Sequence, residues 1–222
     1  MHKITIFNSE SSYFYLTDPK FRDSIRGSLK LFCDSVSLSL ILKLLKIPHK
    51  RLHGPDFMDH HLKNNSNEKI VVIGGSNKAH SKIKVKYNLN NCLFIDKEIK
   101  EESIEELIQD IEEYSPQKIF ICLGLRKQEF IANTIWMQLN KKNKYINSFV
   151  AGVGAAVDFN GETKRRASLS WRRLGMEWLP RLIREPRMVP RIYRSMLGCF
   201  MLLSKSYLFK VDKHVFAEDY YL

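Results

Sequence analysis

The sequence predicts an α/β protein: a Rossmann-like, mostly parallel sheet flanked by helices, with a basic helical C-terminal segment. Short apolar runs at residues 69–73, 119–122 and 149–153 have the composition of buried strands. Helix-type stretches separate such runs, which is the pattern of parallel strands joined by crossover helices. Basic residues then become dense toward the C-terminus. We therefore expect a core over residues 1–161 and a distinct Trp- and Arg-rich segment over residues 162–222.

Composition limits the class of protein. A chain of 222 residues with 44% hydrophobic content can bury one sizeable core. Its four cysteines lie far apart, at positions 33, 92, 122 and 199, which favours reduced thiols in a cytosolic compartment. The first residues lack the features of a signal peptide, and no stretch has the roughly 18 apolar residues of a spanning helix. We expect a protein that is kept inside the cell.

The first half of the chain alternates between the two element types. Strands are expected at residues 3–7, 29–33, 69–73 and 93–96, and helices at residues 18–28, 36–47 and 101–114. The second of these helices carries Leu38, Leu42 and Leu45 on one face, and Pro48 follows its end. Residues 51–56 are expected to form a turn that leads into another short helix.

The second half contains two strand-to-helix junctions. Residues 119–122 form the first expected strand, Gly124 permits a turn, and helical spacing begins at Gln128. The strand expected at residues 149–153 is followed by Gly154. Ligands of open α/β sheets bind where strands end and helices begin, so these junctions predict a pocket.

The basic stretch between residues 164 and 194 contains ten Lys or Arg against two Glu, a large part of the net charge of +12. Within it, helical spacing places four apolar residues on one face: Trp171, Leu174, Trp178 and Leu182. An apolar face flanked by arginines suits a membrane interface, but it equally suits a helix packed on the core. The apolar run 196–203 is too short to span a membrane, and together with the Trp face it favours a peripheral membrane segment.

An ordered set of motif residues runs through the second half: Gly124, Lys127, Gln128, Glu129, Val153, Gly154, Asp158, Phe159, Gly161, Arg166, Ala167, Gly175, Glu177, Trp178, Arg181, Glu185, Pro186 and Arg187. This pattern resembles the WecG/TagA/CpsF family of bacterial glycosyltransferases. Two residues depart from the family pattern, since Arg126 and Ser168 stand where the family has proline.

The resemblance extends more thinly into the first half. It implies that Asp34 is the catalytic aspartate, that Arg51 is the substrate-pocket arginine, and that Asn8 belongs to the site. Further matches are Gly54, Asp56, Gly74 and Gly75. The departures here are Ile6 for threonine, Cys33 for proline, Ser35 for glycine and Pro55 for threonine.

The resemblance implies transfer of an N-acetylhexosamine-type sugar, such as N-acetylmannosamine or its uronic acid. The donor would be a UDP-sugar and the acceptor a polyprenyl-diphosphate-linked sugar, with inversion at the anomeric carbon. The enzyme would act peripherally on the anionic inner face of the plasma membrane, in polysaccharide biosynthesis. We expect no cofactor, no bound metal and no nucleic-acid partner.

Each candidate residue also has a purely structural interpretation. As general base, Asp34 would accept the proton of the acceptor hydroxyl, but Asp34 or Ser35 could instead cap the next helix. Asp158 could contact the donor or hold the turn before Gly161. Gln128 and Glu129 open the expected helix, so their N–H groups could face a diphosphate, although acidic residues also favour a first turn.

The basic residues and histidines likewise have both functional and structural interpretations. No D-x-D occurs in the chain, so the charge of a leaving diphosphate would need protein cations, for which Arg181, Arg184 and Arg187 are candidates. Most of the basic residues would form a solvated face. Four histidines lack metal-ligand spacing and are expected at the surface or in turns: His49, His53, His60 and His61.

Two other functions remain open from the sequence. The net charge of +12 also suits a nucleic-acid-binding protein, although no nucleic-acid module is recognisable. A non-catalytic relative that only binds sugar nucleotide is the second, because Ile6, Cys33 and Ser35 depart from the family pattern.

Overall fold

The structure is a computed structural model, and it describes residues 1–64, 67–96, 99–168, 170–171 and 178–204. The chain divides into two compact units. The first unit comprises Met1–Thr5, Gly27–Leu29 and Gly54–Arg165. The second comprises Ile6–Arg26, Lys30–His53 and Arg166–Leu222, as far as its residues are described.

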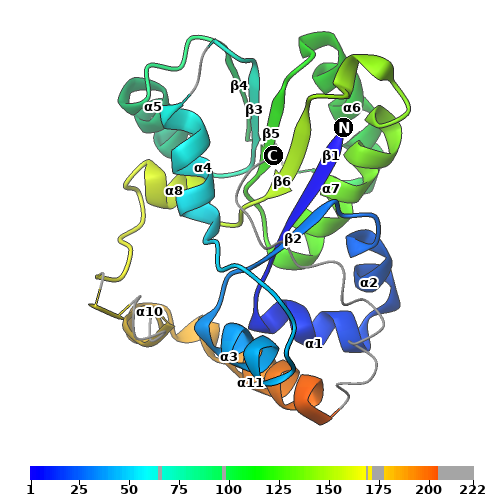
Figure 1. The fold of residues 1–222 in the computed structure, drawn as a ribbon. Helices are drawn as coiled ribbons and strands as arrows, with labels where there is room; N and C mark the ends of the chain where they lie inside the picture. The colour runs from blue at the N-terminus through cyan, green and yellow to red at the C-terminus, as the bar shows by residue number, and fades with distance from the viewer. Residues whose placement is uncertain (65–66, 97–98, 169, 172–177, 205–222) are drawn as a thin grey trace. The chain divides into compact units, whose positions relative to one another are not determined.

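Six parallel strands form one sheet in the order β2-β1-β6-β5-β3-β4 (Figure 1). The strands are β1 (His2–Phe7), β2 (Lys30–Cys33), β3 (Ile70–Ile73), β4 (Cys92–Ile95), β5 (Lys118–Ile121) and β6 (Phe149–Gly152). The predicted α/β class and parallel sheet are therefore confirmed. All six strands were expected within one residue of their observed bounds.

The central strands are apolar because both faces of the sheet are covered. All four residues of β3 and all four of β6 are buried. Strand β5 pairs with β3 through Val71↔Ile119 and with β6 through Ile119↔Val150. Such continuous apolar runs are what a parallel sheet between two helical layers requires.

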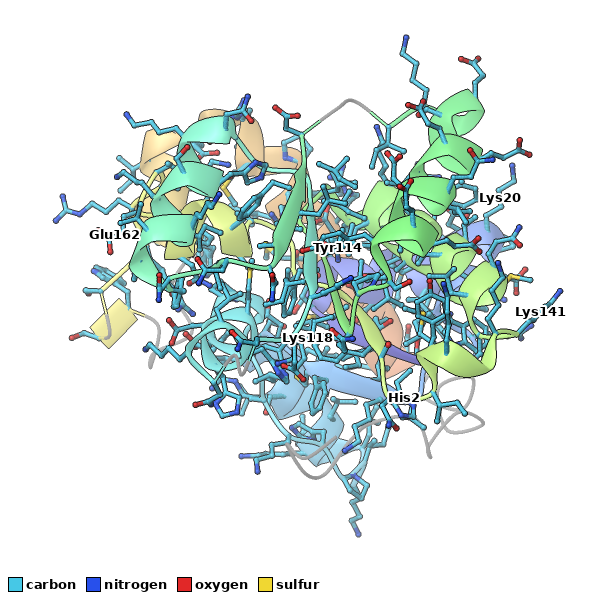
Figure 2. All side chains as sticks on the ribbon, turned by 90° about the horizontal axis from the view of Figure 1, so that it is seen from above. His2, Lys20, Tyr114, Lys118, Lys141 and Glu162 are labelled. Atoms are coloured by element: carbon cyan, nitrogen blue, oxygen red, sulfur yellow. The ribbon has the colours of Figure 1, made fainter. Side chains whose placement is uncertain are left out.

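The helices of the first unit cover both faces of strands β3 to β6. They are α4 (Gly54–Lys63), α5 (Asn77–Lys86), α6 (Ile104–Tyr114), α7 (Leu125–Leu139) and α8 (Ala156–Asn160), with short 3₁₀ turns η1 (Glu101–Ser103) and η2 (Asn143–Tyr145). Figure 1 shows α4, α5 and α8 on one side of these strands and α6 and α7 on the other. In Figure 2, Lys141 and Glu162 point away from the ribbon, whereas Lys118 lies among the strands, where it pairs with Glu68.

Helix α6 shows why a helix could be predicted over residues 101–114. Leu107 and Ile111 are buried in the core cluster under the sheet, and Ile104 and Ile108 pack against its edge. The remaining face carries acidic residues at positions 105, 106, 110, 112 and 113. A stripe of this width, facing a sheet, is the usual pattern of a surface helix.

The second unit contains a group of helices built on a polar seam. Its elements are α1 (Ser9–Thr17), α2 (Pro19–Ile25), α3 (Val36–Leu44), α10 (Trp178–Arg184), η3 (Pro186–Met188) and α11 (Val189–Ser204). Helix α1 packs along α11, and α11 also contacts α3. Buried Glu10 of α1 pairs with Arg191 at 2.9 Å and with Arg194 at 2.7 Å, so two arginines of the basic stretch face inward.

Several element predictions were wrong in extent. Helices α1 and α5 were not expected, and α3 ends at Leu44 instead of residue 47. Helix α4 begins at Gly54, inside the expected turn, and α7 begins at Leu125, three residues before Gln128. The apolar run 196–203 lies within α11. Residues 172–177 and 205–222 lie outside the described part of the chain.

Candidate active site

Gln128 lies where α7 begins, next to the carboxyl end of β5. It is only 3% exposed, and both ends of its side-chain amide are used. Its Oε1 accepts a hydrogen bond from the backbone N–H of Gly154 at 2.7 Å, and its Nε2 donates to Glu129 Oε1 at 3.0 Å. The side chain therefore links the start of α7 to the turn after β6. The sequence indicated both junctions but not this bond between them.

Two glycines make this link possible. A Cβ atom at Gly152 would overlap the side-chain amide of Gln128, so only glycine leaves room for that amide beside the end of β6. Gly154 has φ of +59°, a left-handed conformation that glycine adopts without the usual steric cost. Together they direct a backbone N–H of the turn toward α7.

One backbone expectation for α7 was wrong. Because α7 begins at Leu125, the N–H of Gln128 donates to the carbonyl of Gly124 at 2.9 Å, inside the helix. The N–H groups at the helix start belong to residues 125–127 instead. The strand-to-helix junction was found from the sequence, but its donors lie three residues earlier than expected.

Glu129 is buried, and because α7 begins at Leu125 it lies beyond the first turn in which its sequence position suggested an acidic residue. It is 1% exposed and accepts from Thr5 Oγ1 at 3.3 Å as well as from Gln128. Burial raises the pKa of Glu129 to about 7, against the opposing effects of these hydrogen bonds and of Lys3. The carboxyl group therefore changes between its neutral and charged forms within the physiological pH range.

Lys3 is the cation that faces this carboxyl group. It is fully buried in β1, its Nζ donates to Asn133 Oδ1 at 2.6 Å, and it lies over the Trp136 ring. Burial lowers the pKa of Lys3 to about 8, and the charge of Glu129 opposes that shift. Sequence reasoning missed Lys3, because a lysine within a short strand normally points to solvent.

Asp158 lies in the short helix α8, after β6. Its Oδ1 accepts from Thr163 Oγ1 at 3.2 Å, and its Oδ2 pairs with Lys164 Nζ at 2.5 Å. Its backbone carbonyl also accepts from the N–H groups of Thr163 and Lys164. These contacts favour the structural interpretation, in which Asp158 holds the turn around Gly161.

Asp34 occupies the turn between β2 and α3, in the second unit. The side chain of Ser35 caps α3 by accepting from the N–H of Leu38 at 3.4 Å. The Asp34 backbone N–H donates to Phe7 O at 2.8 Å, which fixes the residue beside β1. The capping role therefore falls to Ser35, and the Asp34 carboxylate, 33% exposed, is used elsewhere.

Two departures from the family pattern build this turn. Cys33 is fully buried, and its thiol donates to the Ser35 carbonyl at 3.4 Å. Burial raises the pKa of Cys33 to about 12, so the thiol stays neutral next to Asp34. Ser35 supplies the cap. Both substitutions thus stabilise the turn that carries the carboxylate.

Arg51 and His53 lie beside Asp34. A parallel bridge between Cys33 and Arg51 fixes the segment next to β2. His53 Nδ1 lies 2.6 Å from Asp34 Oδ1, and an Arg51 terminal nitrogen lies 3.2 Å from His53 Nε2. The two residues picked out by resemblance are thus joined through His53, which was expected to be a plain turn or surface residue.

The other histidine expectations had mixed outcomes. His61 is half-buried against Phe57, Phe120 and Phe149, and burial lowers its pKa to about 4. That position contradicts the expected surface location. His60, by contrast, is exposed on α4.

Asn8 forms a capping box at the start of α1. Its Oδ1 accepts from the N–H of Ser11 at 3.0 Å, and Ser11 Oγ accepts from the Asn8 N–H at 3.2 Å. This local role was not anticipated, because α1 itself was not expected.

The arginine candidates are described only in part. Arg187 is exposed and pairs with Glu185 at 3.5 Å. Arg181 and Arg184 belong to α10, but their side chains lie outside the described part of the structure. Within the described residues, no group of three or more His, Cys, Asp or Glu side chains is arranged to hold a metal ion. In the same residues, no helix combines the length and apolar character needed to cross a membrane.

A comparison with protein families supplies the context for this geometry. The model of the glycosyl transferase WecG/TagA/CpsF family matches residues 2–213, nearly the whole chain. The match includes the turn of Asp34, the segment of Arg51 and both strand-to-helix junctions. The chain therefore belongs to the WecG/TagA/CpsF family of glycosyltransferases, which act in cell-surface polysaccharide biosynthesis.

Proposed function

We propose that this chain transfers an N-acetylhexosamine-type sugar from a UDP-sugar to a polyprenyl-diphosphate-linked acceptor. N-acetylmannosamine or its uronic acid is the sugar that the family resemblance favours. The acceptor hydroxyl oxygen attacks the anomeric carbon while the bond from that carbon to UDP breaks. UDP leaves with the electron pair, and the configuration at the anomeric carbon inverts.

Asp34 is the general base in this proposal. The observation that carries it is that Ser35, and not Asp34, caps α3. The half-buried carboxylate of Asp34 is therefore not required for the cap. A positioned carboxylate that accepts the acceptor proton contributes roughly 10²–10⁴-fold in rate. Arg51 is proposed to assist Asp34 through His53, which contacts both residues.

The strand-to-helix junctions support donor binding in the first unit. The N–H groups of residues 125–127 begin a 15-residue helix, whose positive end favours a diphosphate. Gly124 and Gly154 are proposed to let backbone approach the donor, since a Cβ at either position would meet nothing within 4 Å. Gln128 and Glu129 are proposed to hold these turns in place.

The remaining candidates serve the leaving group and the turns. Arg181, Arg184 and Arg187 are proposed to neutralise the departing diphosphate without a metal ion, since the chain has no D-x-D. Asn8 and Asp158 are proposed to order the segments that meet substrate.

Peripheral docking on the inner face of the plasma membrane is also proposed. The exposed apolar side chains of α11 recur at intervals of four and three residues: Val189, Tyr193, Met196, Phe200 and Leu203. Trp178 of α10 is also partly exposed. An apolar helix face with basic neighbours suits an anionic membrane, where the lipid-linked acceptor lies.

The decisive experiment is a transfer assay that compares Asp34→Asn with Ser35→Ala. The first change keeps the shape of the side chain and removes the proton acceptor, so transfer should fall by roughly 10²–10⁴-fold. The second removes the helix cap, which should cost about 1 kcal/mol of stability and leave turnover largely intact. If Asp34→Asn keeps wild-type turnover, Asp34 is not the base.

Donor binding is tested separately by thermal shift with nucleotide sugars. A donor present at about 100 times its dissociation constant should stabilise the protein by roughly 2.7 kcal/mol. A donor that stabilises the wild-type chain without any transfer would indicate a non-catalytic relative. If no nucleotide sugar stabilises the chain, the proposed donor is wrong.

A further inference from the structure

The turn that carries Asp34 contains a residue that the family pattern does not single out. His53 is 24% exposed and lies between two groups of opposite charge, with Asp34 on its Nδ1 side and Arg51 on its Nε2 side. All three residues belong to the second unit. The short β2 strand and the neighbouring 50–52 segment hold them together through the hydrogen bonds Cys33 N–H to Lys50 O and Leu52 N–H to Cys33 O.

The chemistry of these partners fixes the protonation pattern of the imidazole ring. A guanidinium group carries only hydrogen-bond donors, so His53 Nε2 must accept from Arg51. The acceptor nitrogen then has no proton, and the neutral ring carries its proton on Nδ1. His53 Nδ1 therefore donates to Asp34 Oδ1, at 2.6 Å. A second proton on His53 would place two donors face to face at Nε2.

We propose that His53 is a positioning residue for the general base, held in its Nδ1–H form by Arg51 and Asp34 together. This inference rests on the proposed function of Asp34. The relay Arg51 to His53 to Asp34 commits one carboxylate oxygen, Oδ1, to a fixed hydrogen bond. It thereby sets the rotamer of Asp34 and turns Oδ2 to the acceptor hydroxyl. His53 itself neither takes nor gives the transferred proton.

The variants follow from the geometry. His53→Leu removes the donor and keeps an apolar side chain of similar bulk. His53→Asn places an amide N–H near the former Nδ1 position, so it can still donate to Asp34. His53→Gln places its amide near the former Nε2 position, so it cannot supply the donor that Asp34 needs near Nδ1. A hydrogen bond to a charged group has a net value that corresponds to roughly 10–100-fold in rate.

The kinetic experiment measures kcat and KM for the full chain with UDP-N-acetylmannosamine and a short-chain lipid-linked acceptor. We expect His53→Leu and His53→Gln to lower kcat by roughly 10–100-fold with little change in donor KM. His53→Asn should recover most of that loss. If His53→Leu keeps wild-type kcat, or if His53→Asn is no better than His53→Leu while all variants stay folded, the inference is wrong.

A second measurement does not depend on activity. Long-range ¹H–¹⁵N spectra of histidine-labelled protein distinguish the two neutral tautomers, and the His53→Asn spectrum identifies the His53 signals. We expect the Nδ1–H tautomer at pH 8 in wild type, because the Asp34 carboxylate accepts at Nδ1 and Arg51 donates at Nε2. An Nε2–H tautomer in wild type would overturn the inference even if transfer depends on Asp34. If wild type has the expected tautomer but neither wild type nor any variant transfers sugar, the proposed function fails instead.

Discussion

Gln128 Oε1 accepts the backbone N–H of Gly154 at 2.7 Å, and this bond ties the start of α7 to the turn after β6. We expect Gln128→Met to lower the free energy of unfolding by about 1–3 kcal/mol, because a buried polar group loses its partner. The change also frees the Gly154 turn, so the affinity for a UDP-sugar should fall. Urea unfolding and a donor titration measure the two effects.

Gln138→Met is the matched control for this change. Gln138 lies on the same helix but is exposed. Surface substitutions of this kind usually change stability by no more than about 0.5 kcal/mol. Equal losses in the two variants would show that the Gly154 bond has no special weight.

Glu129 should make stability depend on pH. Its pKa is raised from 4.5 to about 7, so between these values the folded chain keeps a proton that the unfolded chain has lost. The free energy of unfolding therefore falls as pH rises through this window, by roughly 3 kcal/mol in total. Glu129→Gln keeps the shape and removes the titration, so its stability relative to wild type should increase between pH 4.5 and pH 7.5.

Lys3 produces the opposite dependence at higher pH. Its pKa is lowered from 10.5 to about 8, so the free energy of unfolding should rise as pH rises from 8 toward 10.5. The combined cost of burying both groups is thus greatest near pH 7 to 8. Urea unfolding of wild type and Glu129→Gln across pH 4.5–10.5 tests both arms. Parallel stability curves for the two proteins would contradict the role of Glu129.

The strands were predictable because their apolar runs are local and continuous. Helix α1 was not, because the residues that it buries are polar: Ser9, Glu10, Ser11 and Ser12. Burial of Glu10 depends on Arg194, which lies 184 residues away. Two nitrogens of the Arg194 guanidinium group donate hydrogen bonds to the Glu10 carboxylate. Helix α5 buries only Ala79, His80 and Ile83, which is too few apolar residues to produce a helical signal.

Some residues of the candidate site were likewise predictable from the sequence, and others were not. Asp34, Arg51 and Gln128 could be named as candidates from the sequence because a motif marks each of them. His53 was missed because its value comes from a hydrogen bond to a residue 19 positions earlier, across a turn that the sequence does not define. Lys3 was missed because only the structure shows a lysine buried beside Glu129.

Gly198 sets how closely α11 approaches α1. A Cβ atom at this position would lie 2.6 Å from Tyr13 N and 2.7 Å from Ser9 O, both backbone atoms that cannot rotate away. Gly198→Ala should therefore force the helices apart, at a cost of about 1–3 kcal/mol that exceeds the helix-propensity gain of roughly 1 kcal/mol. A lower denaturation midpoint is expected. An unchanged or higher midpoint would contradict this packing.

Transfer should not require a divalent metal. The motivation is the absence of D-x-D from the chain, together with the arginines proposed to meet the diphosphate. We expect the rate in EDTA to equal the rate in magnesium or manganese. Loss of transfer in EDTA that is restored by either ion would show that the diphosphate is held by metal instead.

The exposed apolar face of α11 should bind anionic vesicles. Met196 and Phe200 are 69% and 68% exposed, and each would bury most of its side chain in a membrane interface. Full burial of such a side chain contributes about 1.5–3 kcal/mol, so replacing both with alanine should weaken vesicle binding by roughly 100-fold or more. Alanine is a strong helix former, so α11 itself should persist.

The control pair is Val85→Ala with Met137→Ala, two residues that are likewise apolar and exposed but lie on α5 and α7 of the first unit. Sedimentation with vesicles rich in phosphatidylserine should distinguish the two double variants. A transfer assay run in parallel should show that the α11 variant loses activity toward acceptor in vesicles while it keeps turnover of a soluble short-chain acceptor. Equal sedimentation of both variants would remove α11 from membrane docking, and loss of soluble turnover would assign this face to the chemistry instead.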